Sequence, residues 1–115
     1  MKIETTIRLD DGQKIYIMSK YIIHRHFKQY MRECAADAYI FYWNQEQQLQ
    51  RAMSKFIKDY CPELSEWLIK NKCETSFWVD PKLFKVWDDS ISQFLWGIGF
   101  RHNDPKETMF MLRWA

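Results

Sequence analysis

Glycine is scarce in this chain, with three residues among 115. Gly12, Gly97 and Gly99 are too few and too widely spaced to form a GxxxxGK[ST] phosphate loop or a GxGxxG dinucleotide fingerprint. Both motifs need glycines because the backbone must approach phosphate closely. The sequence therefore excludes these two nucleotide-binding motifs, and we expect no cofactor.

Cysteine is also rare, and Cys34, Cys61 and Cys73 form neither an even set nor a CxxC pair. Such a count is typical of a reducing compartment rather than of a disulfide framework. The apolar run over residues 39–43 has five residues, whereas about 20 are needed to cross a bilayer. The N-terminal residues also lack the apolar stretch of a signal peptide. We therefore expect a cytoplasmic protein without a membrane partner.

The sequence has no set of metal ligands with a recognised spacing. His24 and His26 form an HxH pair, but positions i and i+2 of a helix lie about 200° apart, so both rings cannot easily face one ion. Adding the three cysteines and His102 does not produce a zinc pattern. We expect no metal site.

Apolar and aromatic side chains, in contrast, are plentiful. Hydrophobic residues make up 47% of the chain, and six Trp, six Tyr and eight Phe bring the aromatic share to 17%. This composition is sufficient for a hydrophobic core, and the length indicates a single domain over residues 1–115. The formal net charge of +2 is far from that of a strongly basic nucleic-acid binder.

Hydrophobic periodicity predicts eight elements in the order strand, strand, helix, helix, helix, strand, helix, strand. These elements cover residues 3–9, 14–18, 19–43, 45–60, 62–71, 75–79, 81–96 and 108–114. Within the first helix, residues 39–43 are β-branched and aromatic, a composition that also suits a buried strand. This stretch therefore stays open between helix and strand.

Turn and capping residues support several of these boundaries. Gly12 follows an aspartate in a tight-turn signal, and Ser19 can cap the first helix. Pro62 and Pro81 suit the first turn of a helix, where the missing N–H costs nothing. Gly97 suits a left-handed C-terminal cap for the helix that begins at residue 81.

These elements predict an α+β fold. A small antiparallel or mixed β-sheet, built from the N-terminal hairpin and the C-terminal strands, packs against three to four helices. Short connections permit more than one arrangement of the strands, so the strand order stays open.

One face of the first predicted helix is basic. At 100° per residue its members fall beside the apolar stripe, within a sector about 100° wide. They are Tyr21, His24, Arg25, Lys28 and Arg32. A basic strip with an aromatic side chain can follow a phosphate backbone, so nucleic-acid binding is one alternative function. A solvated helix face is the commoner explanation of such a pattern, and the small net charge supports it.

Signals for catalysis are weak. His102 and Asp104 lie in one turn beside Arg101, a set that a small toxin-like ribonuclease can use. Asn-Asp-Pro is also an ordinary turn initiator, which explains the same residues without chemistry. No cysteine lies in an activating context. We expect a protein that is not an enzyme, with the ribonuclease as a second alternative.

Some aromatic and methionine side chains are left over once the periodic core positions are assigned. Tyr, Trp, Met and Arg are the residue types enriched in protein–protein interfaces. The strands over residues 75–79 and 108–114 place several of them on a sheet face or edge that can receive a partner. The predicted protein-binding residues are Trp78, Met109, Met111, Arg113 and Trp114.

We therefore predict a small binding protein that docks on a larger protein as an inhibitor, adaptor or subunit. Lys outnumbers Arg by 11 to 6 and Ile outnumbers Val by 11 to 2, as in A+T-rich genomes. This bias is compatible with a phage or mobile-element protein that inhibits a host defence protein. Neither the partner's identity nor the oligomeric state follows from the sequence.

Overall fold

The computed structural model describes residues 1–34, 45–81, 93–101 and 103–115, and within these ranges the side chains of residues 23–25 and 45 are not described. Several predictions fall outside these residues. They concern the choice between helix and strand at 39–43, most of the helix predicted from residue 81, and His102.

The N-terminal hairpin is confirmed. Strands β1 (Ile3–Arg8) and β2 (Lys14–Met18) pair antiparallel. Gly12 takes a φ of 85°, a conformation that glycine adopts without strain. The turn is closed by hydrogen bonds from Leu9 N to Gln13 O and from Gly12 N to Leu9 O, each 2.9 Å long.

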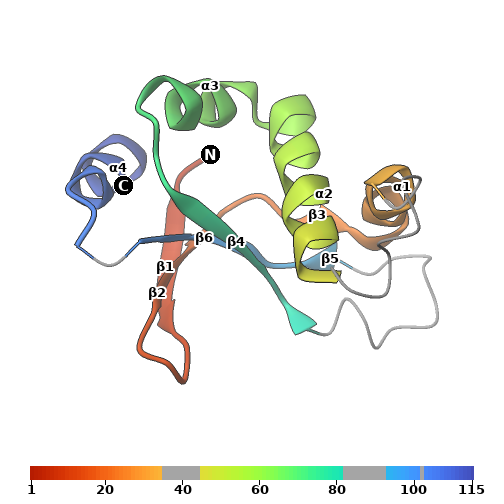
Figure 1. Cartoon of the computed structure of the whole chain (residues 1–115), viewed down its shortest axis with the longest axis horizontal. Coiled ribbons are helices and arrows are strands. Elements are labelled where there is room, and N and C mark those ends of the chain that lie inside the picture. The colour runs from red at the N-terminus through yellow and green to blue at the C-terminus, as the bar shows by residue number, and fades with distance from the viewer. Residues whose placement is uncertain (35–44, 82–92, 102) are drawn as a thin grey trace.

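The hairpin belongs to a four-stranded antiparallel sheet of order β1-β2-β6-β4 (Figure 1). β6 (Trp96–Phe100) lies inside the sheet, and β4 (Thr75–Val79) forms one edge. The predicted bounds of the 75–79 strand are confirmed. A second, two-stranded sheet pairs β3 (Ile22–Ile23) with β5 (Gln93–Phe94).

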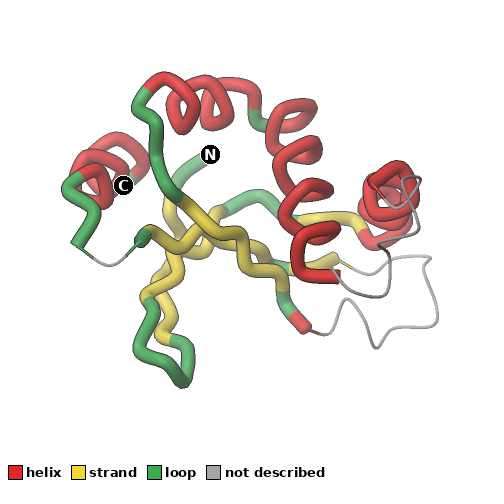
Figure 2. The backbone as a smooth tube through the Cα atoms, viewed as in Figure 1, coloured by secondary structure: helices red, strands yellow, loops and turns green. Residues whose placement is uncertain are grey.

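Four helices are described: α1 (His24–Cys34), α2 (Gln45–Tyr60), α3 (Pro62–Lys70) and α4 (Lys106–Trp114). The predicted α2 and α3 are confirmed, and Pro62 begins α3 as expected. α2 and α3 lie on the same side of the four-stranded sheet, and α4 lies near the opposite end of the sheet from α2 (Figure 2). The predicted α+β class, with hairpin and C-terminal strands in one sheet, is therefore confirmed.

The core lies between the helices and one face of the sheet, which we call the core face. Tyr16 and Met18 from β2 and Trp96 and Ile98 from β6 point into it. Every described helix contributes apolar side chains to the core, namely Phe27, Met53, Phe56, Ile57, Leu64, Leu68, Phe110 and Trp114. One continuous core therefore joins all four helices to the sheet.

The opposite side of the sheet, the back face, closes over the glycines of β6. Ile15 and Ile17 point to this side and are each 1% exposed. They pair with Gly99 and Gly97, respectively. A Cβ atom at Gly97 would lie 2.6 Å from Ile15 Cγ2 and 2.7 Å from the Tyr16 carbonyl oxygen. The isoleucines thus occupy the space that side chains on β6 would need.

Two predictions about helix boundaries are wrong. Gly97 does not cap a helix but lies in β6, between Ile17 and Trp78 of the neighbouring strands. The two-residue alternation of Trp96, Ile98 and Phe100 with glycine is a strand pattern. Helix α1 also begins at His24 rather than at Ser19, because residues 22–23 form β3 first. The Ser19 hydroxyl instead accepts a hydrogen bond from Lys2 N at 3.0 Å.

The predicted closing strand over residues 108–114 is also wrong, because this segment is α4. Phe110 and Trp114, four residues apart, are 0% and 4% exposed, as on the inner face of a helix. The Asp104 carboxylate accepts a 2.9 Å hydrogen bond from Lys106 N ahead of this helix. Asp104-Pro105 is the same helix-start signal as Asp80-Pro81, and the alternation of residues 108–114 obscured it.

We predict that Gly97→Ala destabilises the protein by about 1–3 kcal/mol, the usual cost of overpacking. One of the two close contacts is a backbone oxygen, so a change of rotamer cannot relieve it. Urea unfolding followed by circular dichroism measures this cost. Gly12→Asn is the control, because a Cβ there has open space and asparagine tolerates positive φ. Equal unfolding free energies for the two variants would contradict this account of β6.

Candidate functional site

The five predicted protein-binding residues do not form one surface. Trp114 is 4% exposed and belongs to the core, so it cannot serve as an exposed anchor. Trp78 is half-buried and lies on the back face, because its neighbour Phe77 packs against the core on the opposite side. Met109, Met111 and Arg113 lie on α4, which packs on the core face. Four of the five residues therefore lie on α4, and of these only Met109, Met111 and Arg113 have exposed side chains.

The outer surface of α4 is apolar. Leu112 is 79% exposed, Met109 49% and Met111 40%. Met109 and Leu112 are neighbours three residues apart on the helix surface, and Met111 lies on the other flank of Leu112. Leu112 points away from the buried Phe110 and Trp114, and the two methionines lie on its opposite flanks. We call these three residues the α4 patch. Sequence reasoning missed Leu112, because the strand prediction assigned it to the buried side.

Charged side chains at the rim of the α4 patch are bound within the molecule. The Arg113 guanidinium forms an ion pair with Glu63 of α3 and lies 4.7 Å from the centre of the Trp114 ring. Lys106 Nζ donates to the carbonyl oxygen of Lys72 at 3.0 Å. The predicted binding residue Arg113 therefore helps to fasten α4 to α3.

A buried hydroxyl fastens α4 to the sheet. The Tyr16 hydroxyl donates to Glu107 Oε1 at 2.7 Å, and the Tyr16 ring contacts the Phe110 ring at a centroid distance of 5.6 Å. Burial, followed by this hydrogen bond to the carboxylate, raises the pKa of Tyr16 well above its ordinary value. The helix thus presents the α4 patch from a fixed position.

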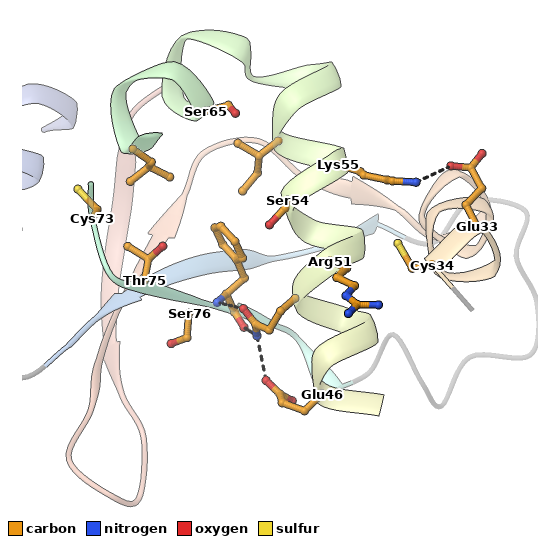
Figure 3. Close-up of a pocket in the computed structure, with 14 residues that line it drawn as sticks. Glu33, Cys34, Glu46, Arg51, Ser54, Lys55, Ser65, Cys73, Thr75 and Ser76 are labelled. Carbon is orange, nitrogen blue, oxygen red and sulfur yellow. Dashed lines mark hydrogen bonds and ion pairs between the residues drawn. The ribbon is translucent and has the colours of Figure 1, made fainter. Parts of the chain in front are cut away.

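A groove of about 790 Å³ lies between α2, α3 and the first three residues of β4 (Figure 3). Glu46, Arg51 and Ser54 line it from α2, while Thr75 and Ser76 line it from β4. Figure 3 also shows Glu33 and Lys55 meeting across α1 and α2, with their charged atoms 3.8 Å apart. Hydroxyl and charged groups therefore share the lining of this groove with apolar side chains such as Ile57, Leu68 and Phe77. No motif in the sequence pointed to it, because α2 and β4 meet only in the folded chain.

A second hollow of about 690 Å³ lies beside the hairpin turn. Arg8, Lys14 and Arg101 line it together with Asp11 and Glu107. The carboxylates offset the cations, and Arg101 is paired with Glu74 at 2.8 Å. This balance of charge does not favour an anion.

The predicted basic strip is described only in part. Tyr21, just before α1, is 46% exposed, and Arg32 is exposed as well. Lys28 is half-buried and has an interaction partner. The side chains of His24 and Arg25 lie outside the described part of the structure. Nucleic-acid binding through this helix stays a prediction.

The cysteines are free thiols, and burial raises the pKa of Cys61 and of Cys73, which disfavours the reactive thiolate. Among the described residues, no three His, Cys, Asp or Glu side chains converge as metal ligands would. None of the helices in the described ranges has the length and hydropathy needed to span a membrane.

Comparison of the chain with family models, with curated proteins and with solved structures gives no match.

We predict that Trp114→Ala destabilises the protein by about 3–5 kcal/mol, the cost of emptying a large buried site. Leu112→Ala, two residues away but exposed, should change the free energy of unfolding by less than about 0.5 kcal/mol. Thermal and urea unfolding of both variants measure the difference. Comparable losses would contradict the assignment of Trp114 to the core and Leu112 to the surface.

We also predict that Tyr16→Phe destabilises the protein by about 1.5 kcal/mol at neutral pH, because Glu107 loses its donor. Unfolded Tyr16 loses its proton near its ordinary pKa of 10, whereas the folded protein retains it. The folded state then binds more protons, so stability falls as the pH rises above 10. The difference between the parent and Tyr16→Phe should be constant between about pH 7 and 9 and narrow above pH 10. Urea unfolding across this range tests it, and a difference that widens would contradict the proposed bond.

Proposed function

We propose that this protein is a non-catalytic binding protein whose α4 patch inserts into an apolar groove on a larger partner protein. The single observation that carries this proposal is the exposure of three large apolar side chains on one short helix, with Leu112 opposite the buried side and a methionine on each flank. Single exposed apolar residues are common on protein surfaces, but contiguous groups mark sites of association.

The residue types of the patch support the same proposal. Methionine is unbranched and polarizable, so Met109 and Met111 can adapt to the contours of a partner. Leu112, the most exposed of the three, is at the centre and is suited to fill a pocket. Arg113, held in an ion pair, and Lys106, held by a hydrogen bond, form a polar rim beside the apolar patch. An apolar centre with a polar rim is the usual composition of a protein–protein interface.

The way α4 is held also favours recognition by a partner. An isolated helix of nine residues is marginal in water. Here Phe110 and Trp114 are buried and Glu107 accepts from Tyr16, so the helix is ordered before any partner arrives. Preorganisation lowers the entropic cost of association. A helix seated in a groove is a recurring mode of protein recognition, and the role is then that of an inhibitor, adaptor or subunit.

Affinity purification from a lysate of the source organism tests this function with matched variants. Leu112→Glu and Met109→Glu place a charge at the patch and should abolish capture of the partner. Ile69→Glu is the control, because Ile69 is 74% exposed on α3 and lies outside the patch. Binding of the purified partner should weaken by about 30-fold or more in the two patch variants, as for a hot spot of ~2 kcal/mol.

Circular dichroism and thermal unfolding should show that all three variants keep the fold, since exposed substitutions change stability little. Equal capture by Leu112→Glu and Ile69→Glu would overturn the assignment of the patch. Recovery of nucleic acid alone, with strong salt dependence, would favour the alternative based on α1.

A further inference from the structure

The outer edge of β4 carries regularly spaced backbone groups that no described strand pairs with. At the ends of the strand, Glu74 O accepts from Arg101 N, and Asp80 N donates to Leu95 O. In an antiparallel ladder the direction of the backbone groups alternates along the strand. Even-numbered residues of β4 therefore bond to β6, while Thr75, Phe77 and Val79 direct their N–H and C=O groups outward.

The middle outward position is satisfied by a side chain instead of a strand. Gln50 Oε1 accepts from Phe77 N at 2.7 Å, and Gln50 Nε2 donates to Phe77 O at 2.8 Å. These two bonds are the pair that a residue of an adjacent strand would form. Gln50 Nε2 also donates a second hydrogen bond, to Glu46 Oε1 at 2.9 Å. The Gln50 amide thus imitates one residue of a fifth strand.

The groove over this edge has the size and chemistry for an extended peptide. Its volume of about 790 Å³ lies within the range of about 300–1,000 Å³ usual for ligand sites. Glu46 is bound to Gln50, and Lys55 lies near Glu33. Arg51 lines the same groove, and the described residues contain no carboxylate that forms an ion pair with it. An acidic side chain on the peptide would supply one.

We propose that β4 receives an extended segment of a partner protein as a fifth strand, with an acidic residue near Arg51. In the absence of the partner, the Gln50 side-chain amide occupies the hydrogen-bonding positions of the Phe77 N–H and C=O groups. The incoming backbone then displaces this amide. Addition of a strand to an open edge draws its affinity from main-chain hydrogen bonds and its selectivity from side-chain pockets. This site is separate from the α4 patch, since α4 and α2 lie at different ends of the sheet (Figure 1).

The probe is an end-blocked, fluorescein-labelled peptide of alternating threonine and valine with one central aspartate, and binding is followed by fluorescence anisotropy. Thr75→Pro removes an outward N–H without touching a bond to β6, and edge strands tolerate proline at such positions. It should weaken binding at least about tenfold. Thr75→Val keeps the N–H and should bind like the parent.

Gln50→Ala tests whether the Gln50 amide competes with the peptide for Phe77 or instead contacts the bound peptide. Removal of a competing amide should strengthen peptide binding about tenfold, whereas removal of a direct contact would weaken it. Gln47→Ala, exposed on the same helix, is the control and should leave the affinity unchanged. In Arg51→Ala the preference for the aspartate peptide over a matched lysine peptide should disappear.

Hydrogen exchange of the parent protein gives a readout that does not depend on any variant folding. The peptide should slow exchange at the amides of Thr75 and Val79, while Ser76 and Trp78 already donate within the sheet and should change little. Leu112→Glu should leave peptide affinity intact, so failure of the α4 patch would not affect this result.

Several outcomes would overturn the proposal. These are the absence of peptide binding, equal affinity of Thr75→Pro and Thr75→Val, or weaker binding by Gln50→Ala. A concentration-dependent dimer in analytical ultracentrifugation that Thr75→Pro dissociates would assign the edge to a second copy of this chain instead.

Discussion

Strand β6 must be buried on both faces and paired along both edges, and the rest of the structure depends on this constraint. All five of its residues are buried, and β2 and β4 pair with its two sides. Its core face carries Trp96, Ile98 and Phe100, while glycine on its back face lets Ile15 and Ile17 pack closely. Because large side chains alternate with glycine, β6 can pack against the helices on its core face and pair with both β2 of the hairpin and the edge strand β4.

The side chains of β6 also determine where the helices lie. The Trp96 ring contacts Phe56 of α2 at a centroid distance of 5.8 Å, and its indole N–H donates to the carbonyl oxygen of Lys20. At the other end, Phe100 contacts Phe110 of α4 at 5.0 Å. Because α2 and α4 are both anchored to β6, one places Gln50 against β4 and the other turns Leu112 outward. Both proposed surfaces thus follow from the same packing.

Elements with strong local signals were predictable from the sequence. The first strand of the hairpin has a two-residue alternation and leads into a glycine turn, and α2 has an uninterrupted stripe of apolar residues. Pro62 marked the start of α3, and the short run at residues 75–79 marked β4. In each case neighbouring residues along the chain supply the information, so no tertiary contact was needed to identify the element.

The sequence by itself determined the α+β class, the hairpin, α2, α3 and β4, because periodicity and turn chemistry act over a few residues. Tertiary structure decided the nature of residues 108–114, where apolar residues over one or two turns fit both a strand and a helix. Burial of Phe110 against Tyr16, Phe100 and Trp67, together with burial of Trp114 in the core, selects the helix. It also decided the surfaces: Leu112 is exposed, and Gln50 meets Phe77, 27 residues away. Such contacts depend on how elements pack, and packing is a property of the whole chain.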